Sequence, residues 1–273
     1  MSVDRNSPIG VFDSGIGGLT VVREIMRNLP SESIVYFGDT ARVPYGSKSA
    51  ETITRYSEQI CRFLIGKQVK AVVVACNTAS AFALEAVQKE FSIPIIGVIR
   101  AGAEVAASST RNGRIGIIGT EGTIGSGIHA SFLKKLDPKI EVIGKACPLF
   151  VPLAEEGWTH DPVTEEVARR YLAELKSQNI DTLILGCTHY PLLRSTIRKV
   201  MGEGVQLVNP AYETALELKQ LLKERNLECE ADPQAEPEYR FYVSDLADKF
   251  RHFANTILPY DVPLTKKINI ERY

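Results

Sequence analysis

The sequence predicts an α/β protein of two similar lobes, each with a mainly parallel sheet flanked by helices. We expect the lobes to be related by a pseudo-twofold axis, with the active site in the cleft between them. First, short apolar runs alternate with segments of helical periodicity, which is the βαβ pattern. Second, the Val-rich run at 69–75 is typical of a parallel strand covered on both faces. Third, the pattern restarts near residue 115, and 273 residues are enough for two lobes.

The first half of the chain contains four expected strands, and helical spacing follows the first three. These strands are expected at 9–12, 34–37, 69–75 and 95–99. A helix after the first strand is indicated by one apolar face, made of Leu19, Val22, Ile25, Met26 and Leu29. The same period recurs at positions 53, 56, 60 and 64, and again at 84, 87 and 91.

The second half repeats the alternation. Its strands are expected at 115–118, 140–143, 183–186 and 205–208. Asp161 is suited to cap a helix that has Pro162 at its first position, and an apolar face continues through Val167, Tyr171 and Leu175. After the third of these strands, Pro191 can occupy the first turn of another helix.

The two halves align in order. "IGVFDSG" at residue 9 matches "IGIIGTE" at residue 115, an offset of 106. "VVVACNT" at residue 72 matches "LILGCTH" at residue 183, and "PIIGV" at 94 matches "VQLVN" at 205, both at an offset of 111. The shared order predicts two lobes with equivalent strands.

The tail after residue 210 has no counterpart in the second half. It holds a helical run at 214–222, a strand-like FYVSD at 241–245 and a helical segment around 250–257. We therefore expect the tail to pack on the first lobe. The predicted division is 1–98 with 211–273 for the first lobe, and 99–210 for the second.

Composition and motif spacing argue against several classes of partner and site. A net charge of −1 and the lack of a Lys/Arg run argue against a nucleic-acid partner. No apolar stretch approaches the ~20 residues that cross a bilayer, and the N-terminus has no signal-peptide pattern, so we expect a cytoplasmic protein without a membrane partner. Five cysteines, an odd number, favour free thiols over disulfides. No CxxC or HExxH spacing occurs, so no metal site is expected.

Two cysteines stand at equivalent strand ends, Cys76 in "VVVACNTASAF" and Cys187 in "LILGCTHYPLL". Ligands of open parallel sheets bind at the carboxyl ends of the strands. A thiol before a helix N-terminus meets free N–H groups and the positive end of the helix dipole, which favour the thiolate. Nearby hydroxyls could hold a carboxylate together with those N–H groups. They belong to Ser14, Thr78, Thr120 and Thr188.

Two thiols on opposite faces of a small substrate suit inversion at carbon, because one thiolate removes a proton and the other thiol returns one.

Other interpretations of these residues remain open. A lone cysteine is more often a small buried apolar residue, as fits Cys61 and Cys147. Cys187 with His189 could instead be a hydrolase nucleophile and base. A two-lobed binding protein without chemistry is a third possibility. Asp13 could simply cap the helix that begins near residue 18.

Four segments resemble the motifs of glutamate racemases, in the aspartate/glutamate racemase superfamily. They are "GVFDSGIGGLTV", "YFGDTARVPYG", "VVVACNTASA" and "LILGCTHYPLL". The resemblance runs in order from residue 9 to about 209. It implies cofactor-independent racemization of L-glutamate to D-glutamate, a product that goes into peptidoglycan, and a homodimer. A pyridoxal enzyme needs a Schiff-base lysine, and none stands at the strand ends.

The resemblance also implies roles for individual residues. Cys76 and Cys187 would be the acid/base pair, supported by Asp13 at Cys76 and by His189 at Cys187. Glu155 would be an acidic residue near the second cysteine. The residues implied to bind substrate are Asp13, Ser14, Tyr45, Gly46, Asn77, Thr78, Thr120, Thr123, Thr188 and His189.

Overall fold

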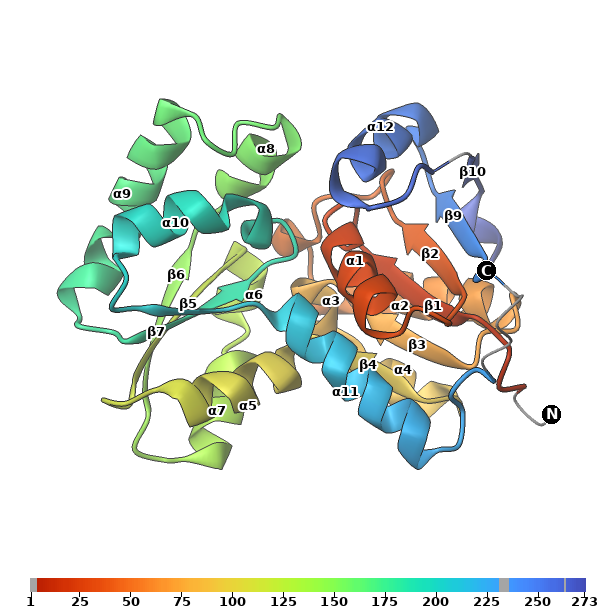
Figure 1. Ribbon diagram of the computed structural model, residues 1–273, viewed down its shortest axis with the longest axis horizontal. Helices are drawn as coiled ribbons and strands as arrows, with labels where there is room; N and C mark the ends of the chain where they lie inside the picture. The colour runs from red at the N-terminus through yellow and green to blue at the C-terminus, as the bar shows by residue number, and fades with distance from the viewer. Residues whose placement is uncertain (1–3, 231–235, 263) are drawn as a thin grey trace.

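The computed structural model describes residues 4–230, 236–262 and 264–273, and it contains two parallel sheets that lie side by side (Figure 1). The six-stranded sheet consists of β1 Ile9–Asp13, β2 Ile34–Gly38, β3 Ala71–Val74, β4 Ile95–Gly97, β9 Tyr239–Val243 and β10 Thr265–Lys267. The four-stranded sheet consists of β5 Arg114–Gly119, β6 Glu141–Ala146, β7 Thr182–Gly186 and β8 Gln206–Val208. Every strand pairing recorded in them is parallel.

Both sheets contain the same strand order. β2-β1-β3-β4 in the larger sheet corresponds to β6-β5-β7-β8 in the smaller one. β1 and β5 are therefore equivalent, as are β3 and β7, which confirms the order found in the sequence. Phe12 lies opposite Val74 in one sheet, and Ile118 lies opposite Leu185 in the other. Cys76 and Cys187 thus follow equivalent strands.

Helices cover both faces of each sheet. The helices are α1 Leu19–Asn28, α2 Ala50–Ile65, α3 Asn77–Phe82, α4 Leu84–Glu90, α5 Ile99–Ser109, α6 Glu121–Gly125, α7 Ile128–Leu136, α8 Phe150–Glu155, α9 Pro162–Ser177, α10 Arg194–Met201, α11 Pro210–Glu224 and α12 Ala247–Ile257. Three 3-10 turns are η1 Tyr45–Ser47, η2 Tyr190–Leu193 and η3 Ile270–Arg272. On the larger sheet, α1, α11 and α12 pack on one face, and α2, α3 and α4 on the other. On the smaller sheet, α8, α9 and α10 pack on one face, and α5 and α7 on the other.

The tail packs on the first sheet, as the sequence predicts. β9 pairs with β2, and β10 pairs with β9. α11 contacts both α1 and α5, and it lies along the junction of the two halves in Figure 1. The division at 98/99 and 210/211 stays a prediction.

Several predicted boundaries are wrong. The strand expected at 95–99 ends at Gly97, and Ile99 already begins α5. The strand expected at 69–75 is shorter, since β3 runs from Ala71 to Val74. Lys70, just before it, is fully buried, and its Nζ lies 2.5 Å from Oε2 of Glu32. The sequence did not predict α5, α6, α7, α8 or β10. α5 is rich in alanine and other small residues, so its apolar face contrasts little with its other faces.

The described part of the chain contains no helix that is long and apolar enough to span a membrane.

Candidate active site

One cavity lies where the carboxyl ends of the two sheets meet, as expected for parallel sheets. Both halves of the chain line it: Ser14, Gly15, Val43, Pro44, Tyr45, Gly46, Cys76, Asn77 and Thr78 from the first, and Thr120, Thr123, Val151, Glu155, Gly186, Cys187, Thr188 and His189 from the second. Every predicted site residue is in this lining except Asp13, which is fully buried beside it. The structure therefore brings the predicted residues to one place.

Cys76 follows β3 and caps α3. Its Sγ accepts a hydrogen bond from the Ala79 N–H at 3.5 Å and lies 3.6 Å from the Ser14 hydroxyl oxygen. Burial raises the pKa of the Cys76 thiol to about 12, the negative charge of Asp13 acts in the same direction, and the Ala79 and Ser14 hydrogen bonds oppose both. The Ala79 N–H at the helix start lowers the pKa of the thiol, as expected. Desolvation is the larger effect, so Cys76 rests as a thiol.

Asp13 closes β1 and organises the turn that leads into α1. Its Oδ2 accepts hydrogen bonds from the Gly15 and Gly18 N–H groups, both at 3.1 Å. Its Oδ1 is buried and has no hydrogen-bond partner among the described residues. Burial raises the pKa of Asp13, while the charge of His189 and the backbone N–H groups lower it. Asp13 therefore both holds the turn and keeps one free carboxylate oxygen near Cys76.

Cys187, His189 and Glu155 form a chain on the other side of the cavity. The Cys187 Sγ lies 3.8 Å from Nδ1 of His189, and Nε2 of the same ring lies 3.1 Å from Oε1 of Glu155. Burial opposes a charge on the ring, but the hydrogen bonds with Cys187 and Glu155 outweigh it and raise the pKa of His189 to about 10. The hydrogen bond with His189 lowers the pKa of Glu155. A cationic ring therefore lies beside the Cys187 sulfur.

The two cysteines therefore differ in surroundings although their strands are equivalent. Cys76 caps an α-helix, whereas the residues after Cys187 turn first and form η2 from Tyr190. The predicted helix start at Pro191 is this 3-10 turn, with α10 after it. One thiol has an anionic neighbour and the other a cationic one, which is an arrangement suited to one acid and one base.

Three hydroxyl groups meet across the cavity. The Thr78 Oγ1 lies 3.0 Å from Oγ1 of both Thr120 and Thr123, and the latter two are also 3.0 Å apart. Thr120 caps α6 by accepting from the Thr123 N–H. Beside them, Oδ1 of Asn77 is buried without a hydrogen-bond partner among the described residues. These groups can bind the polar ends of a small ligand.

Tyr45 offers a ligand its backbone N–H and not its hydroxyl. Its hydroxyl donates to Asp39 inside the protein and is therefore occupied. The N–H groups of Tyr45 and Gly46 open the η1 turn and have no acceptor within it. Any contact of this segment with a ligand is expected to use those N–H groups.

Five residues line the cavity without having been predicted as site residues: Gly15, Val43, Pro44, Val151 and Gly186. Val43 and Pro44 belong to the quoted "YFGDTARVPYG" segment and could have been found there. Val151 lies on α8, a helix that periodicity did not reveal, and no sequence signal marks it.

The lobes are closed on one another. The cavity measures about 60 Å³, whereas small-molecule sites usually measure about 300–1,000 Å³. A Cβ on Gly46 would lie only 2.7 Å from Cβ of Thr120, so the backbones approach closely there. The Thr20 hydroxyl also donates to the Thr188 carbonyl across the junction at 3.0 Å. A cavity of this volume is too small for an amino acid, so ligand entry requires a wider arrangement of the residues around it.

Comparison with known proteins identifies the family. A family model described as Asp/Glu/Hydantoin racemase matches residues 9–218. The chain is 53% identical over 250 residues to the glutamate racemase of Geobacter metallireducens, covering 92% of each. The chain belongs to the glutamate racemases. It is therefore an isomerase, and the resemblance seen in the sequence motifs is confirmed.

Solved structures agree with this assignment. A glutamate racemase isoform from Bacillus anthracis is 42% identical, with a TM-score of 0.92 over 97% of this enzyme and 98% of that chain. A glutamate racemase from Francisella tularensis, solved in complex with D-glutamate, is also 42% identical, with a TM-score of 0.91 over 98% and 100%. The two-lobed α/β fold is thus that of the family.

Proposed function

We propose that this enzyme interconverts L- and D-glutamate without a cofactor, with Cys76 and Cys187 acting on opposite faces of the α-carbon. The observation that carries the proposal is the placement of two thiols at equivalent strand ends, both lining one cavity. A single nucleophilic cysteine would leave the other thiol unexplained. The choice of glutamate rests on the family.

Each turnover transfers two protons, one from the substrate to Cys187 and one from Cys76 to the substrate. The Cys187 thiolate, stabilised by cationic His189, takes the α-proton as the Cα–H bond breaks and an S–H bond forms. The electron pair remains on the α-carbon and its carboxylate. The Cys76 S–H then breaks and delivers its proton to the opposite face, which inverts the configuration. The opposite enantiomer runs the same steps in reverse.

The cavity offers groups that can stabilise the carbanion without an electron sink. The hydroxyl cluster of Thr78, Thr120 and Thr123 and the free N–H groups at the start of η1 are oriented dipoles for the carboxylates. Asn77, Ser14 and Thr188 complete the proposed substrate contacts, together with Asp13 and His189. Among the described residues, no lysine lines the cavity to form a Schiff base.

Isotope exchange tests the two-base step. The enzyme is incubated with L-glutamate in deuterium oxide without cofactor, and optical rotation and α-proton signals are followed together. Because the Cys76 thiol exchanges with solvent, early D-glutamate should carry deuterium while the remaining L-glutamate keeps its proton. D-glutamate that retains the original proton would contradict the two-base mechanism.

Substitution of either thiol is the second test. Cys76→Ala and Cys187→Ala should each lower kcat by at least about 10³-fold, because each face needs its own acid/base group. Cys61→Ala is the matched control, since Cys61 is a buried thiol of α2 outside the cavity lining. Near-normal turnover in either active-site variant would show that the assigned pair is wrong.

One observation favours a second candidate. The chain from Cys187 through His189 to Glu155 has the order of a nucleophile, base and orienting acid. Cys187 and His189 are only two residues apart, yet the ring lies 3.8 Å from the sulfur. A covalent acyl adduct at Cys187 found by mass spectrometry would support hydrolysis, and turnover without an adduct supports racemization.

We extend the proposal to the cellular setting that the family resemblance implies. D-glutamate made by the enzyme would serve peptidoglycan synthesis, in the cytoplasm, where reducing conditions keep both thiols free. The functional form would be a homodimer. Depletion in the source cell should be rescued by D-glutamate, and sedimentation should give twice the 30.1 kDa chain mass.

A further inference from the structure

The loop from Asp39 to Gly46 connects β2 to the cavity. Val43, Pro44, Tyr45 and Gly46 from this loop all line the cavity. The loop also forms part of the junction with the second lobe, because Gly46 packs against Thr120. Its conformation therefore bears on how the cavity is shaped and how it closes.

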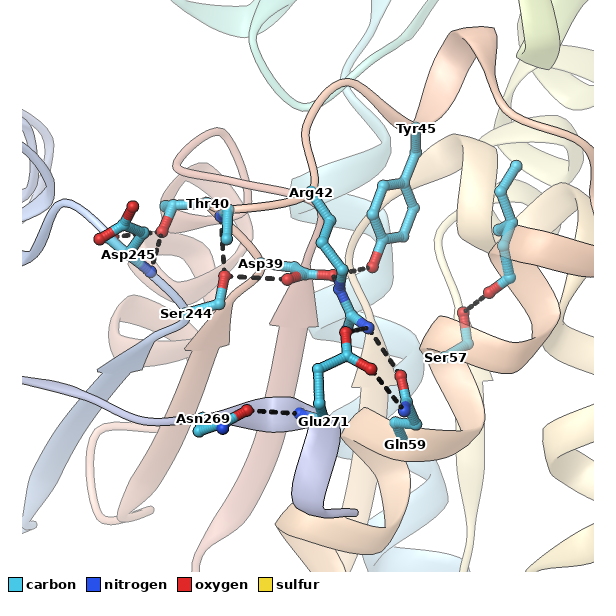
Figure 2. A network of polar contacts seen from close by, with 12 residues as sticks. Asp39, Thr40, Arg42, Tyr45, Ser57, Gln59, Ser244, Asp245, Asn269 and Glu271 are labelled. Atoms are coloured by element: carbon cyan, nitrogen blue, oxygen red, sulfur yellow. Dashed lines mark hydrogen bonds and ion pairs between the residues drawn. The ribbon is translucent and has the colours of Figure 1, made fainter.

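Asp39 is the centre of the contacts that hold this loop (Figure 2). Its side chain is fully buried. One carboxylate oxygen accepts from the Tyr45 hydroxyl and from the Arg42 Nε–H at 2.7 Å. The other accepts from the Ser244 hydroxyl at 2.9 Å, and the Asp39 N–H donates to the Asp13 carbonyl. A buried carboxylate with three donors is held in one position.

The donors come from different parts of the chain. Tyr45 lines the cavity, Ser244 follows β9 of the tail, and the Arg42 side chain extends toward Gln59 and Glu271. The Arg42 guanidinium lies 3.8 Å above the Tyr56 ring and also donates to Gln59 at 2.6 Å and to Glu271 at 3.1 Å. Glu271 is 63% exposed, so we expect this outermost contact to contribute little.

The neighbouring residues fix the start of the loop to the same tail segment. The Ala41 N–H donates to the Ser244 hydroxyl at 2.8 Å, and the Thr40 hydroxyl accepts from the Asp245 N–H at 2.9 Å. The start of the loop is thus tied to the tail, and the hydrogen bond of the Tyr45 hydroxyl connects its far end to Asp39. The Tyr45–Asp39 hydrogen bond is the contact that relates the anchored part to the cavity-lining part.

We propose that Asp39 is a positioning residue for the racemase reaction: through the Tyr45 hydroxyl it fixes the N–H groups of Tyr45 and Gly46 where the substrate carboxylate binds. The inference rests on the proposed function. Asp39 touches neither substrate nor the reacting thiols. Its loss should weaken substrate and transition state alike, which raises KM and leaves kcat almost unchanged.

The test uses Tyr45→Phe, which keeps the ring and the backbone and removes only the hydroxyl. We expect KM for L-glutamate to rise roughly three- to tenfold, the effect of losing about one buried hydrogen bond, with kcat within about twofold of the wild type. Asp39→Asn should raise KM further, because it also leaves Arg42 without its buried carboxylate. The melting temperature of each variant is recorded, and kinetics are measured well below it.

Ser57→Ala is the matched control, since Ser57 is a fully buried residue near the network whose hydroxyl bonds only to the Ile53 carbonyl of its own helix. It should lose some stability and keep both kinetic constants. Unchanged KM in folded Tyr45→Phe, a fall in kcat at unchanged KM, or an equal rise of KM in Ser57→Ala would each overturn the inference. Wild-type enzyme that does not racemize glutamate would instead refute the proposed function.

Discussion

Replacing His129 should remove an acid-sensitive component of stability. His129 lies on α7, is 3% exposed, and has no hydrogen-bond partner for either ring nitrogen among the described residues. Burial lowers the pKa of this imidazole from 6.5 to about 4. The folded protein therefore binds a proton there less readily than the unfolded chain does.

The direction and the size of the pH effect on stability follow from this difference in the pKa of His129. Stability from a neutral His129 is complete above about pH 6.5 and is lost as the pH falls toward 4, because the unfolded chain takes up the proton first. A difference of about 2.5 pKa units corresponds to roughly 3 kcal/mol in all. About 2 kcal/mol of this should already be lost at pH 5.

Urea unfolding of wild type and His129→Leu at pH 7.5 and pH 5 checks the prediction. Leucine has a similar volume and no polar atom to desolvate, so the variant should be at least as stable at pH 7.5. At pH 5 its advantage should have grown by about 2 kcal/mol. His252→Leu, at an exposed histidine of α12, controls for removing a histidine as such. An advantage that stays constant within about 0.5 kcal/mol would refute the reasoning.

Three further changes test other contacts. In Gly17→Ala the new Cβ would lie 2.5 Å from Nδ1 of His189, so kcat should fall at least about tenfold with little change in the circular dichroism spectrum; normal kcat would show that the junction adapts freely. Glu155→Gln weakens the support that raises the pKa of His189, so the alkaline limb of the kcat/KM profile should move to lower pH, and an unmoved limb would contradict this role. Lys70→Met leaves the 5%-exposed Glu32 carboxylate without its buried cation and should cost about 3–5 kcal/mol in urea unfolding; a loss below about 1 kcal/mol would mean that water or another group replaces the ion pair.

The sequence alone predicted the elements whose positions depend on neighbouring residues in the chain. Short continuous apolar runs located the strands that lead to Cys76 and Cys187, and the 3.6-residue period located several of the helices between strands. The order of matching segments predicted two equivalent sheets, which the strand orders confirm. Family motifs added the substrate and most of the cavity lining. Periodicity did not reveal α5, whose small residues give little apolar contrast, or α8, which is only six residues long.

Tertiary structure decided the features that depend on residues far apart in the chain. No sequence pattern links Asp39 with Ser244, which are 205 residues apart, and the family resemblance placed Glu155 near Cys187 without orienting it on His189, 34 residues away. The sequence also predicted a thiolate-favouring site at both cysteines. Burial raises the pKa of Cys76 against that expectation, while Cys187 has a cationic ring beside it. Local pattern determines which elements form and where a thiol stands. Desolvation and charge at that thiol arise only when distant segments pack around it, and they determine whether it holds or accepts the proton.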